Sequence, residues 1–266
     1  MKFKFTDYHL HTANWSVDIG KNGPKFEDYI EVAEKNEINI CFLEHYELYY
    51  IEKDKTNPFY NGNIENYLEE LDELKETYDF IYSGLEVDYY KDREIELVEL
   101  MDDYESELDF IAGTLHEWIF GYPITSKEKL LELLSKKRMK NIIDEYFDIS
   151  KMMIDSKIFK HICHLDTIFR YINDKDIKPE EDCNVSEDRV LELGQLCIKN
   201  NISIEYNLSG IKFPIGRPFP SRMIVSQLKK EGGKFFVGSD SHKLDYFESQ
   251  VTKVKEAYEY INSIEH

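Results

Sequence analysis

The chain has 266 residues, of which 42% are hydrophobic and 32% are charged. This composition supports a substantial core, and the lack of a linker rich in proline, glycine and serine favours one compact domain over residues 1–266. The formal net charge of −20 would repel nucleic acid, and no run approaches the roughly 18 apolar residues that cross a membrane, so we expect a cytoplasmic protein with neither partner.

Short apolar runs typical of β-strands alternate along the chain with segments whose apolar residues recur with a period near 3.6. In chain order, the predicted strands cover residues 3–9, 38–43, 80–87, 110–115, 161–165, 203–207 and 234–238. The predicted helices cover residues 26–36, 64–78, 186–200 and 221–231, and the stretch 126–154 is expected to hold two more. Ser126 and Ser186 are expected helix N-caps. Seven βα units in one domain predict an α/β fold with a distorted, TIM-like (β/α)7 barrel.

Each predicted strand ends in a residue that can bind a metal or accept hydrogen bonds. In chain order these residues are His9 and His11, Glu44 and His45, Glu86, His116, His164 and Asp166, Asn207, and Asp240 and His242. In a barrel of parallel strands, the carboxyl ends of all strands face the same side, where the chemistry collects. One histidine at a strand end is usually structural, but so many of them together favour convergence on one site. His161, at the start of its strand, is expected to be structural.

The types of these side chains indicate metal binding. Residues i and i+2 of an extended chain point to the same side, so both imidazoles of His9-x-His11 can reach one ion. The same holds for Asp240 and His242 if the chain stays extended there. Nitrogen and carboxylate ligands without thiolate suit Zn²⁺, Mn²⁺ or Fe²⁺. Seven or eight ligands exceed one tetrahedral site, so two or three divalent ions are expected, with Glu86 bridging a pair.

A series of short motifs resembles the PHP (polymerase and histidinol phosphatase) superfamily, and within it the monofunctional histidinol-phosphate phosphatases. The resemblance spans nearly the whole chain, in the motifs DYHLHT, FLEH, SGLEVDY, AGTLH, HLDTIFRY, YNLSGIK, PFPS and VGSDSH. The segments NLSGIK and PFPS favour the phosphatase branch over polymerase-associated domains. The resemblance implies a trinuclear metal site. One ion would be bound by His9, His11, Glu86 and Asp240, a second by Glu86, His116 and His164, and a third by His45, His242 and a residue of the loop after His11.

The sequence departs from the family pattern at that last ligand. Many relatives have a histidine or aspartate where this chain has Val17, and Asp18 follows directly. An insertion of one residue would make Asp18 the ligand. The alternative is that Asp18 is an ordinary loop residue and that the third ion is weakly bound or absent.

Phosphate recognition in the family uses arginines from the segments that read TIFRY and SGIK in this chain. The resemblance therefore nominates Arg170 and Lys212, and Arg217 on the next loop is a further candidate. A lysine at position 212 supplies charge but cannot form a bidentate fork with phosphate. Each of these cations could instead pair with a carboxylate of this acidic chain.

The function implied by the resemblance is metal-dependent hydrolysis of L-histidinol phosphate to L-histidinol and phosphate, in histidine biosynthesis. Arg170 would hold the phosphoryl oxygens, and Asp240 and His242 are candidates for protonating the leaving group, although a metal ligand makes a poor acid. Two alternatives stay open. The chain could act on another small phosphate ester, or it could be a PHP-like binding module without activity.

Overall fold

The computed structural model of the protein describes residues 2–61, 63–177 and 186–265. Within these residues, the strands form one seven-stranded sheet in the order β1-β2-β3-β4-β5-β6-β7. The strands are β1 (Thr6–Leu10), β2 (Asn39–Tyr46), β3 (Ile81–Asp88), β4 (Phe110–Thr114), β5 (His161–Ile162), β6 (Ser203–Asn207) and β7 (Phe235–Gly238). Neighbouring strands pair in parallel, for example β1 with β2 and β5 with β6. The predicted distorted (β/α)7 barrel is confirmed.

The helices that follow the strands agree well with the predicted ones. They are α1 (Phe26–Lys35), α3 (Glu65–Lys75), α5 (Lys127–Leu134), α6 (Met139–Ser156), α7 (Glu187–Lys199) and α8 (Arg222–Lys230). The hydroxyl oxygens of Ser126 and Ser186 accept hydrogen bonds from the third residues of α5 and α7, which confirms both predicted N-caps. Additional elements are α2 (Leu48–Ile51), α4 (Glu94–Tyr104), α9 (Leu244–Ser263) and the 3₁₀ turns η1 (Thr167–Phe169) and η2 (Leu208–Lys212).

Two predicted strands lose three predicted residues each in the structure. The predicted strand 161–165 is regular only at His161 and Ile162, because the chain turns at His164, whose φ is +20°. The backbone N–H of Thr167 donates to the carbonyl of His164 at 2.9 Å and closes this turn. The prediction was therefore wrong for residues 163–165. Residues 3–5 also lie outside β1.

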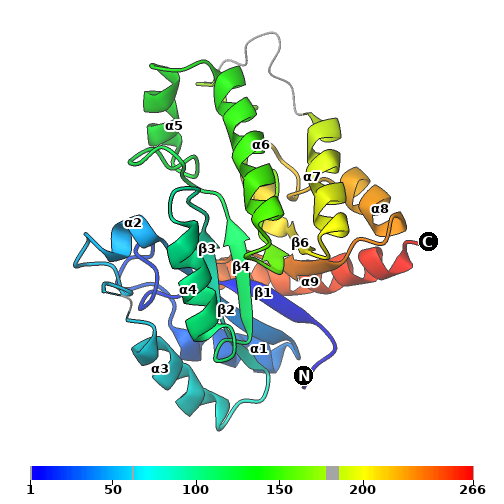
Figure 1. Cartoon of the computed structure of the whole chain (residues 1–266). Coiled ribbons are helices and arrows are strands. Elements are labelled where there is room, and N and C mark those ends of the chain that lie inside the picture. Colours follow the sequence, from blue (N-terminus) through cyan, green and yellow to red (C-terminus); the bar gives the residue numbers. More distant parts are fainter. Residues whose placement is uncertain (1, 62, 178–185, 266) are drawn as a thin grey trace. The chain divides into compact units, whose positions relative to one another are not determined.

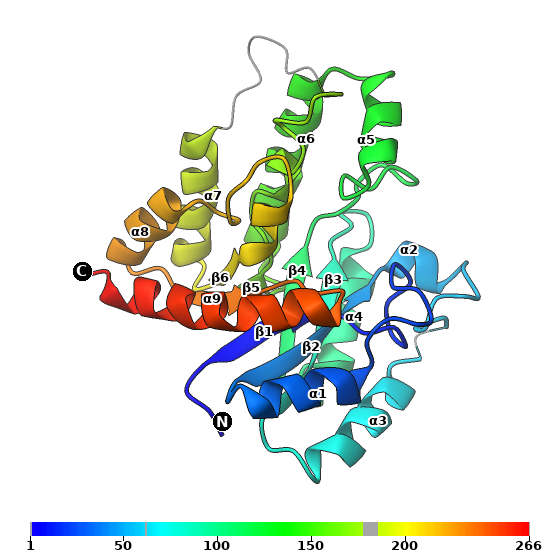
Figure 2. The same cartoon turned by 180° about the vertical axis from the view of Figure 1, so that it is seen from behind.

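The chain divides into two compact units. Unit 1 comprises Met1–Val87, Glu99–Ala112 and Val237–Ser263, and unit 2 comprises Asp88–Val98, Gly113–Phe236 and Ile264–His266. In unit 1, α1 and α9 lie side by side along β1 and β2 (Figure 2). In unit 2, α7 lies beside α6 and α8 (Figure 1). The expectation of one functional domain over residues 1–266 stays a prediction.

The core of unit 1 fixes the loop that follows β7. Tyr29 of α1 is fully buried, packs against the ring of Phe42, and donates its hydroxyl to the carbonyl of Ser241 at 3.0 Å. Ser241 forms a parallel bridge with Leu10 at the end of β1. The candidate residues on either side of Ser241 are thereby held next to those of β1.

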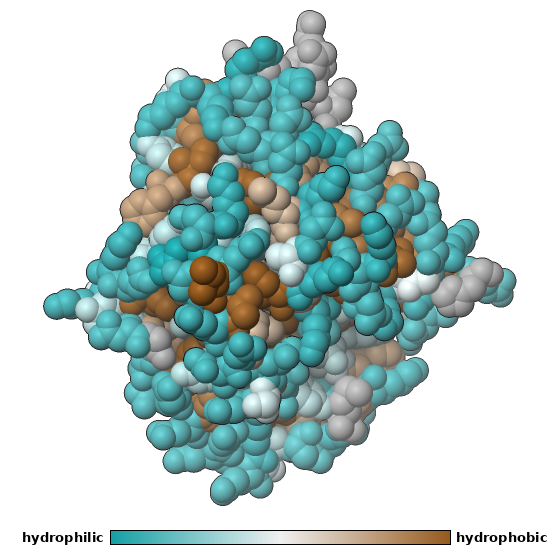
Figure 3. All heavy atoms as spheres, in the orientation of Figure 1, coloured by the Kyte–Doolittle hydropathy of each residue, from teal (hydrophilic) through white to brown (hydrophobic). Residues whose placement is uncertain are grey.

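The surface agrees with the acidic composition. Most of the face drawn in Figure 3 is hydrophilic, with small hydrophobic patches between the polar side chains. Individual large apolar side chains, such as Ile95 and Val98 of α4, are exposed. None of the helices in the described part of the chain combines the length and the apolar character that crossing a membrane requires.

Gly84 of β3 lies where the sheet leaves no room for a side chain. A Cβ at this position would approach the carbonyl oxygen of Phe110 to 2.7 Å and a methyl group of Leu43 to 2.9 Å. We expect Gly84→Ala to destabilise the protein by about 1–3 kcal/mol, because the backbone at Phe110 must shift. Urea denaturation measures this change. Gly20→Ala is the matched control, since a Cβ there meets nothing within 4 Å, and an equal effect of both substitutions would contradict the explanation.

Candidate metal centre

Four candidate ligands in unit 1 come from three adjacent strands. His9 lies in β1, His11 follows this strand directly, His45 lies in β2 and Glu86 lies in β3. The parallel register places His45 opposite Glu86. Because the strands present these residues at the same level, their side chains meet in the structure as the sequence predicts.

Glu86 is the centre of this group. Its Oε2 atom lies 3.1 Å from Nδ1 of His45, 3.3 Å from Nε2 of His9 and 3.8 Å from Nε2 of His11. The side chains of Glu86, His9 and His11 are at most 1% exposed, and that of His45 is 16% exposed. One carboxylate oxygen therefore faces three imidazoles in a nearly dry environment.

The remaining candidates of unit 1 come from the loops after β1 and β7. Nε2 of His242 lies 2.9 Å from Oδ2 of Asp18, and Nε2 of His45 lies 3.9 Å from the same atom. Oδ1 of Asp240 lies 3.4 Å from Nδ1 of His242 and 3.8 Å from Nε2 of His11. The structure thus brings Asp18 to the histidines, whereas Val17 is half exposed.

The chain does not stay extended between Asp240 and His242, so that condition for placing both side chains on one side is not met. The φ angle of Asp240 is +54°, in the left-handed region that aspartate tolerates better than most residues. The turn brings the two side chains together by another route. A strained backbone at such a position is common where a side chain must be aimed.

The geometry of these residues fits a divalent cation. Two ligands of a tetrahedral zinc ion, at about 2.0–2.1 Å from the metal, lie roughly 3.3 Å apart, which matches the distances around Glu86. Ligand atoms of His9, His11 and Glu86 lie within 4.8 Å of one another, as do those of His11, His45 and His242. Nε2 of His11 is buried and has no hydrogen-bond partner among the described residues. Such an atom is explained if it binds a metal ion.

The charges of these groups are strongly coupled. Burial lowers the pKa of His45, but the hydrogen bond to Glu86 and the charges of Glu86 and Asp18 outweigh it and raise this pKa to about 10. Burial and the neighbouring histidines lower the pKa of His11 well below its usual value. Burial acts to raise the pKa of Asp18, but the hydrogen bond and charge of His242 lower it below the usual range. The carboxylates therefore attract a cation here, whether a proton or a metal ion.

In unit 2, His116 and His164 form a second pair. His116 follows β4, and His164 follows β5 at the turn described above. Their Nε2 atoms lie 3.2 Å apart, and both residues are buried. Two imidazole nitrogens at this distance can ligate one ion.

Arg170, at the end of η1, is buried and has no carboxylate partner among the described residues. Its side chain lies over the ring of Phe213 at 4.3 Å, and the residue is 8% exposed. Its Nε atom has no hydrogen-bond partner in the described part of the chain. Burying a guanidinium without an ion pair costs free energy, and a bound anion that accepts its hydrogen bonds offsets this cost. Lys212, by contrast, is exposed, with its ammonium 5.5 Å from the same ring.

Arg217 is engaged by carboxylates of unit 2. Its NH2 group donates to Oδ2 of Asp166 at 2.8 Å and lies 3.6 Å from Oε1 of Glu187. Asp166 is fully buried, and burial raises its pKa to about 6 against the opposing charge of Arg217. Arg217 therefore forms the ion pair that the sequence left open as the alternative role for each of these cations. A direct contact of Arg217 with substrate stays a prediction.

His161 forms its hydrogen bond with Ser203 on the neighbouring strand β6, which agrees with the structural role expected for it. Three buried carboxylates around the histidines were not predicted as site residues: Asp7, Asp88 and Glu205. Glu44 was predicted as a polar residue at a strand end, but it was not assigned to a metal ion. Asp7 and Glu205 accept the backbone N–H groups of His9 and His164 at 3.2 and 2.9 Å. Their positions in the sequence could have indicated them. Asp7 and Glu205 each lie two residues before a polar residue at a strand end, His9 and Asn207, and Asp88 is the last residue of β3.

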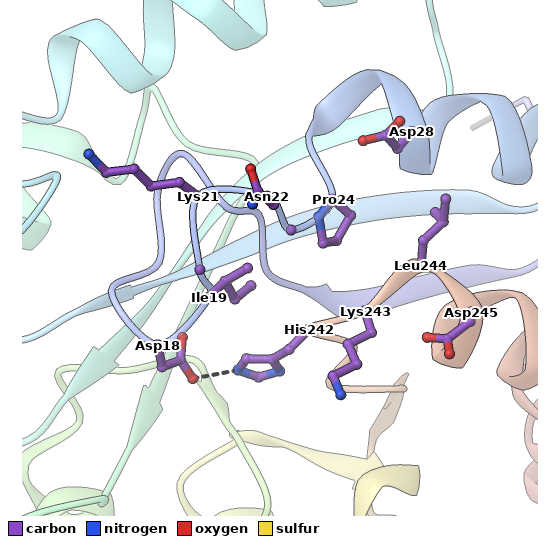
Figure 4. A pocket seen from close by; sticks show the side chains of 12 residues that line it. Asp18, Ile19, Lys21, Asn22, Pro24, Asp28, His242, Lys243, Leu244 and Asp245 are labelled. Carbon is purple, nitrogen blue, oxygen red and sulfur yellow. Dashed lines mark ion pairs between the residues drawn. The ribbon is translucent and has the colours of Figure 1, made fainter.

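A pocket of ≈ 670 Å³ opens beside Asp18 and His242 in unit 1. Figure 4 shows the ion pair of these two residues at its edge, with the loop of Ile19–Pro24 on one side and the start of α9 on the other. Lys243 and Asp245 contribute charged side chains to the lining. The edge of the candidate centre is therefore open to small molecules.

Two solved structures have a fold similar to that of this chain. A candidate histidinol phosphatase, HisK, from Listeria monocytogenes superposes with a TM-score of 0.78 at 17% sequence identity, over 93% of this chain and 99% of that chain. The histidinol phosphate phosphatase from Lactococcus lactis subsp. lactis, solved with zinc, L-histidinol and phosphate, superposes with a TM-score of 0.74 at 21% identity, over 98% of this chain and 94% of that chain.

The chain has the fold of these phosphatases. Searches against protein-family models and against curated proteins found no match. The resemblance noted in the sequence is therefore confirmed at the level of the fold, and it covers almost the full length of both structural neighbours. At identities of 17% and 21%, activity must be argued from the site itself.

Proposed function

We propose that this chain is a metal-dependent phosphomonoesterase whose substrate is L-histidinol phosphate. The observation that carries the proposal is the convergence of His9, His11 and His45 on one buried oxygen of Glu86. Such a set of nitrogen and carboxylate ligands, without thiolate, suits zinc, manganese or iron. The choice of substrate is supported by the fold shared with a phosphatase that was solved with zinc, L-histidinol and phosphate.

Two or three divalent ions would be held by the candidate ligands. His9, His11, Glu86 and Asp240 would hold one ion, His45, His242 and Asp18 another, and His116 with His164 would contribute to a further one. When bound, such ions lower the pKa of a coordinated water to about 7 and neutralise phosphoryl oxygens.

Arg170 supplies the anion recognition in this proposal. Its guanidinium is held over Phe213 and has no carboxylate partner among the described residues. A planar guanidinium can donate two parallel hydrogen bonds to a phosphoryl group. Because the contact with Phe213 already orients the guanidinium of Arg170, little conformational entropy of this side chain is lost when the phosphate binds.

The proposal is tested by phosphate release from a panel of substrates. The purified protein, supplied with Zn²⁺, Mn²⁺ or Fe²⁺ in parallel, is assayed on L-histidinol phosphate, on ethanolamine phosphate, which lacks the imidazole, and on p-nitrophenyl phosphate. We expect kcat/KM for L-histidinol phosphate to exceed the other values by at least about 100-fold. Release from the other esters alone would keep the phosphatase and reject the substrate. Absence of release from metal-loaded protein would favour a binding module without activity.

A further inference from the structure

Two buried carboxylates lie behind candidate metal ligands, each within one unit. In unit 1, Oε2 of Glu44 lies 3.8 Å from Nδ1 of His11. In unit 2, Oδ2 of Asp88 lies 3.4 Å from Nδ1 of His116. Both carboxylates are completely buried. Neither belongs to the ligand sets proposed above, and a buried carboxylate is costly without a partner, so their burial next to the histidines requires an explanation.

The two ring nitrogens of His11 have different surroundings. Nδ1 faces Glu44 and also lies 3.5 Å from Oγ of Ser16, which itself donates to Oε2 of Glu44 at 2.8 Å. Nε2 lies 3.8 Å from both Glu86 and Asp240. The ring therefore has one side toward Glu44 and the other toward the proposed ligands.

Glu44 also anchors the loop after β1. Its Oε1 atom accepts hydrogen bonds from the backbone N–H and the hydroxyl of Thr12, at 2.8 and 2.7 Å. Together with the bond from Ser16, these contacts tie the loop that leads to Asp18 to strand β2, next to His45. One buried side chain thus connects the segments that carry three candidate ligands.

His116 repeats this arrangement in unit 2. Its backbone N–H donates to Oδ1 of Asp88 at 2.7 Å, and its Nδ1 faces the other oxygen of the same carboxylate. Its Nε2 lies 3.2 Å from Nε2 of His164. Here too, the carboxylate and the other candidate ligand, His164, face different ring nitrogens of His116.

We propose that Glu44 and Asp88 are positioning residues that hold His11 and His116 as the Nδ1–H tautomer, so that Nε2 of each presents its lone pair to a divalent cation. A neutral imidazole has one N–H donor and one acceptor nitrogen, and a carboxylate next to one nitrogen selects the donor there. Such partners also raise the basicity of a ligating histidine. The inference rests on the proposed metal centre.

The tautomers are measured first, in the metal-free protein. Long-range ¹H–¹⁵N correlation spectra distinguish protonated from unprotonated ring nitrogens, and single histidine substitutions assign the signals. We expect His11 and His116 to carry the proton on Nδ1 in the wild type, and Glu44→Gln and Asp88→Asn each to lower that population for its own histidine. Protons on Nε2 in the wild type would overturn the proposal.

Metal affinity is the second readout, measured by competition with a chelator for Zn²⁺ and Mn²⁺. Glu44→Gln and Asp88→Asn should each weaken binding by about 10–100-fold. Asp7→Asn is the matched control, because Asp7 is equally buried but accepts hydrogen bonds from the backbone N–H of His9 and from Ser239. Unchanged affinity in both variants, or an equal loss in Asp7→Asn, would overturn the proposal.

These readouts separate the inference from the proposed function. A wild type that binds no metal would refute the proposed function, and the tautomers alone would then decide whether Glu44 and Asp88 orient the rings. Because the two variants lie in different units, failure of one to fold leaves the other as a test. Circular dichroism of each variant establishes that it is folded.

Discussion

Replacing Glu86 with glutamine should abolish metal binding at the centre of unit 1 and reduce kcat/KM for phosphate release by at least about 10³-fold, or about 4 kcal/mol of transition-state stabilisation. The reason is that one oxygen of Glu86 lies within 3.8 Å of three histidines. An amide retains the shape of the side chain but carries no negative charge, so the three histidines would no longer share an anionic ligand with the metal ion.

Metal content by elemental analysis and steady-state kinetics measure this change. Glu34→Gln is the matched control, since Glu34 carries the same carboxylate on the surface of α1, where it pairs with Lys2. The control should retain its metal and its activity. A Glu86→Gln variant that released phosphate at the wild-type rate would show that the cluster around Glu86 has no role in the reaction.

Arg170→Ala should lower kcat/KM by about 10²–10³-fold, the loss typical for removal of one donor to a charged transition state. The buried position, the stacking on Phe213 and the lack of a carboxylate partner among the described residues all indicate a guanidinium prepared for an anion. Arg170→Lys should recover only part of the activity, because an ammonium group cannot form the bidentate fork.

Lys212→Ala is the control for Arg170. Lys212 lies near the same ring but is exposed, so its charge is screened by solvent, and we expect less than a tenfold change. Inorganic phosphate, tested as a competitive inhibitor, gives a second readout, and its inhibition constant should rise in Arg170→Ala. Equal effects of Arg170→Ala and Lys212→Ala on both readouts would contradict the assignment.

Much of the fold was predictable because its signals are local. The alternation of apolar strands and amphipathic helices is set by side-chain spacing, and serine caps mark helix starts at Ser126 and Ser186. Helix α4 gives a weaker signal, since Ile95 and Val98 are exposed and blur its apolar face. Helix α9 was not among the predicted elements, although its buried residues recur at helical spacing.

The candidate ligands were predictable for the same reason. A parallel barrel brings strand ends together, so a polar residue at the end of a predicted strand is a candidate whatever its neighbours in sequence are. The turn at His164 and the left-handed backbone of Asp240 could not be predicted, because distant segments hold them: the backbone N–H of His164 donates to Glu205, and that of Ser241 donates to the carbonyl of His9. The roles of Glu44 and Asp88 depend in the same way on which ring nitrogen they face, which only three-dimensional structure shows.

The most direct test of metal-dependent phosphatase activity is phosphate release from L-histidinol phosphate by one protein sample before and after chelation. We predict that the chelated protein releases no phosphate above background, and that Zn²⁺, Mn²⁺ or Fe²⁺ restores activity in parallel with the binding of two or three ions per chain. Equal rates in metal-free and metal-loaded protein would contradict the account.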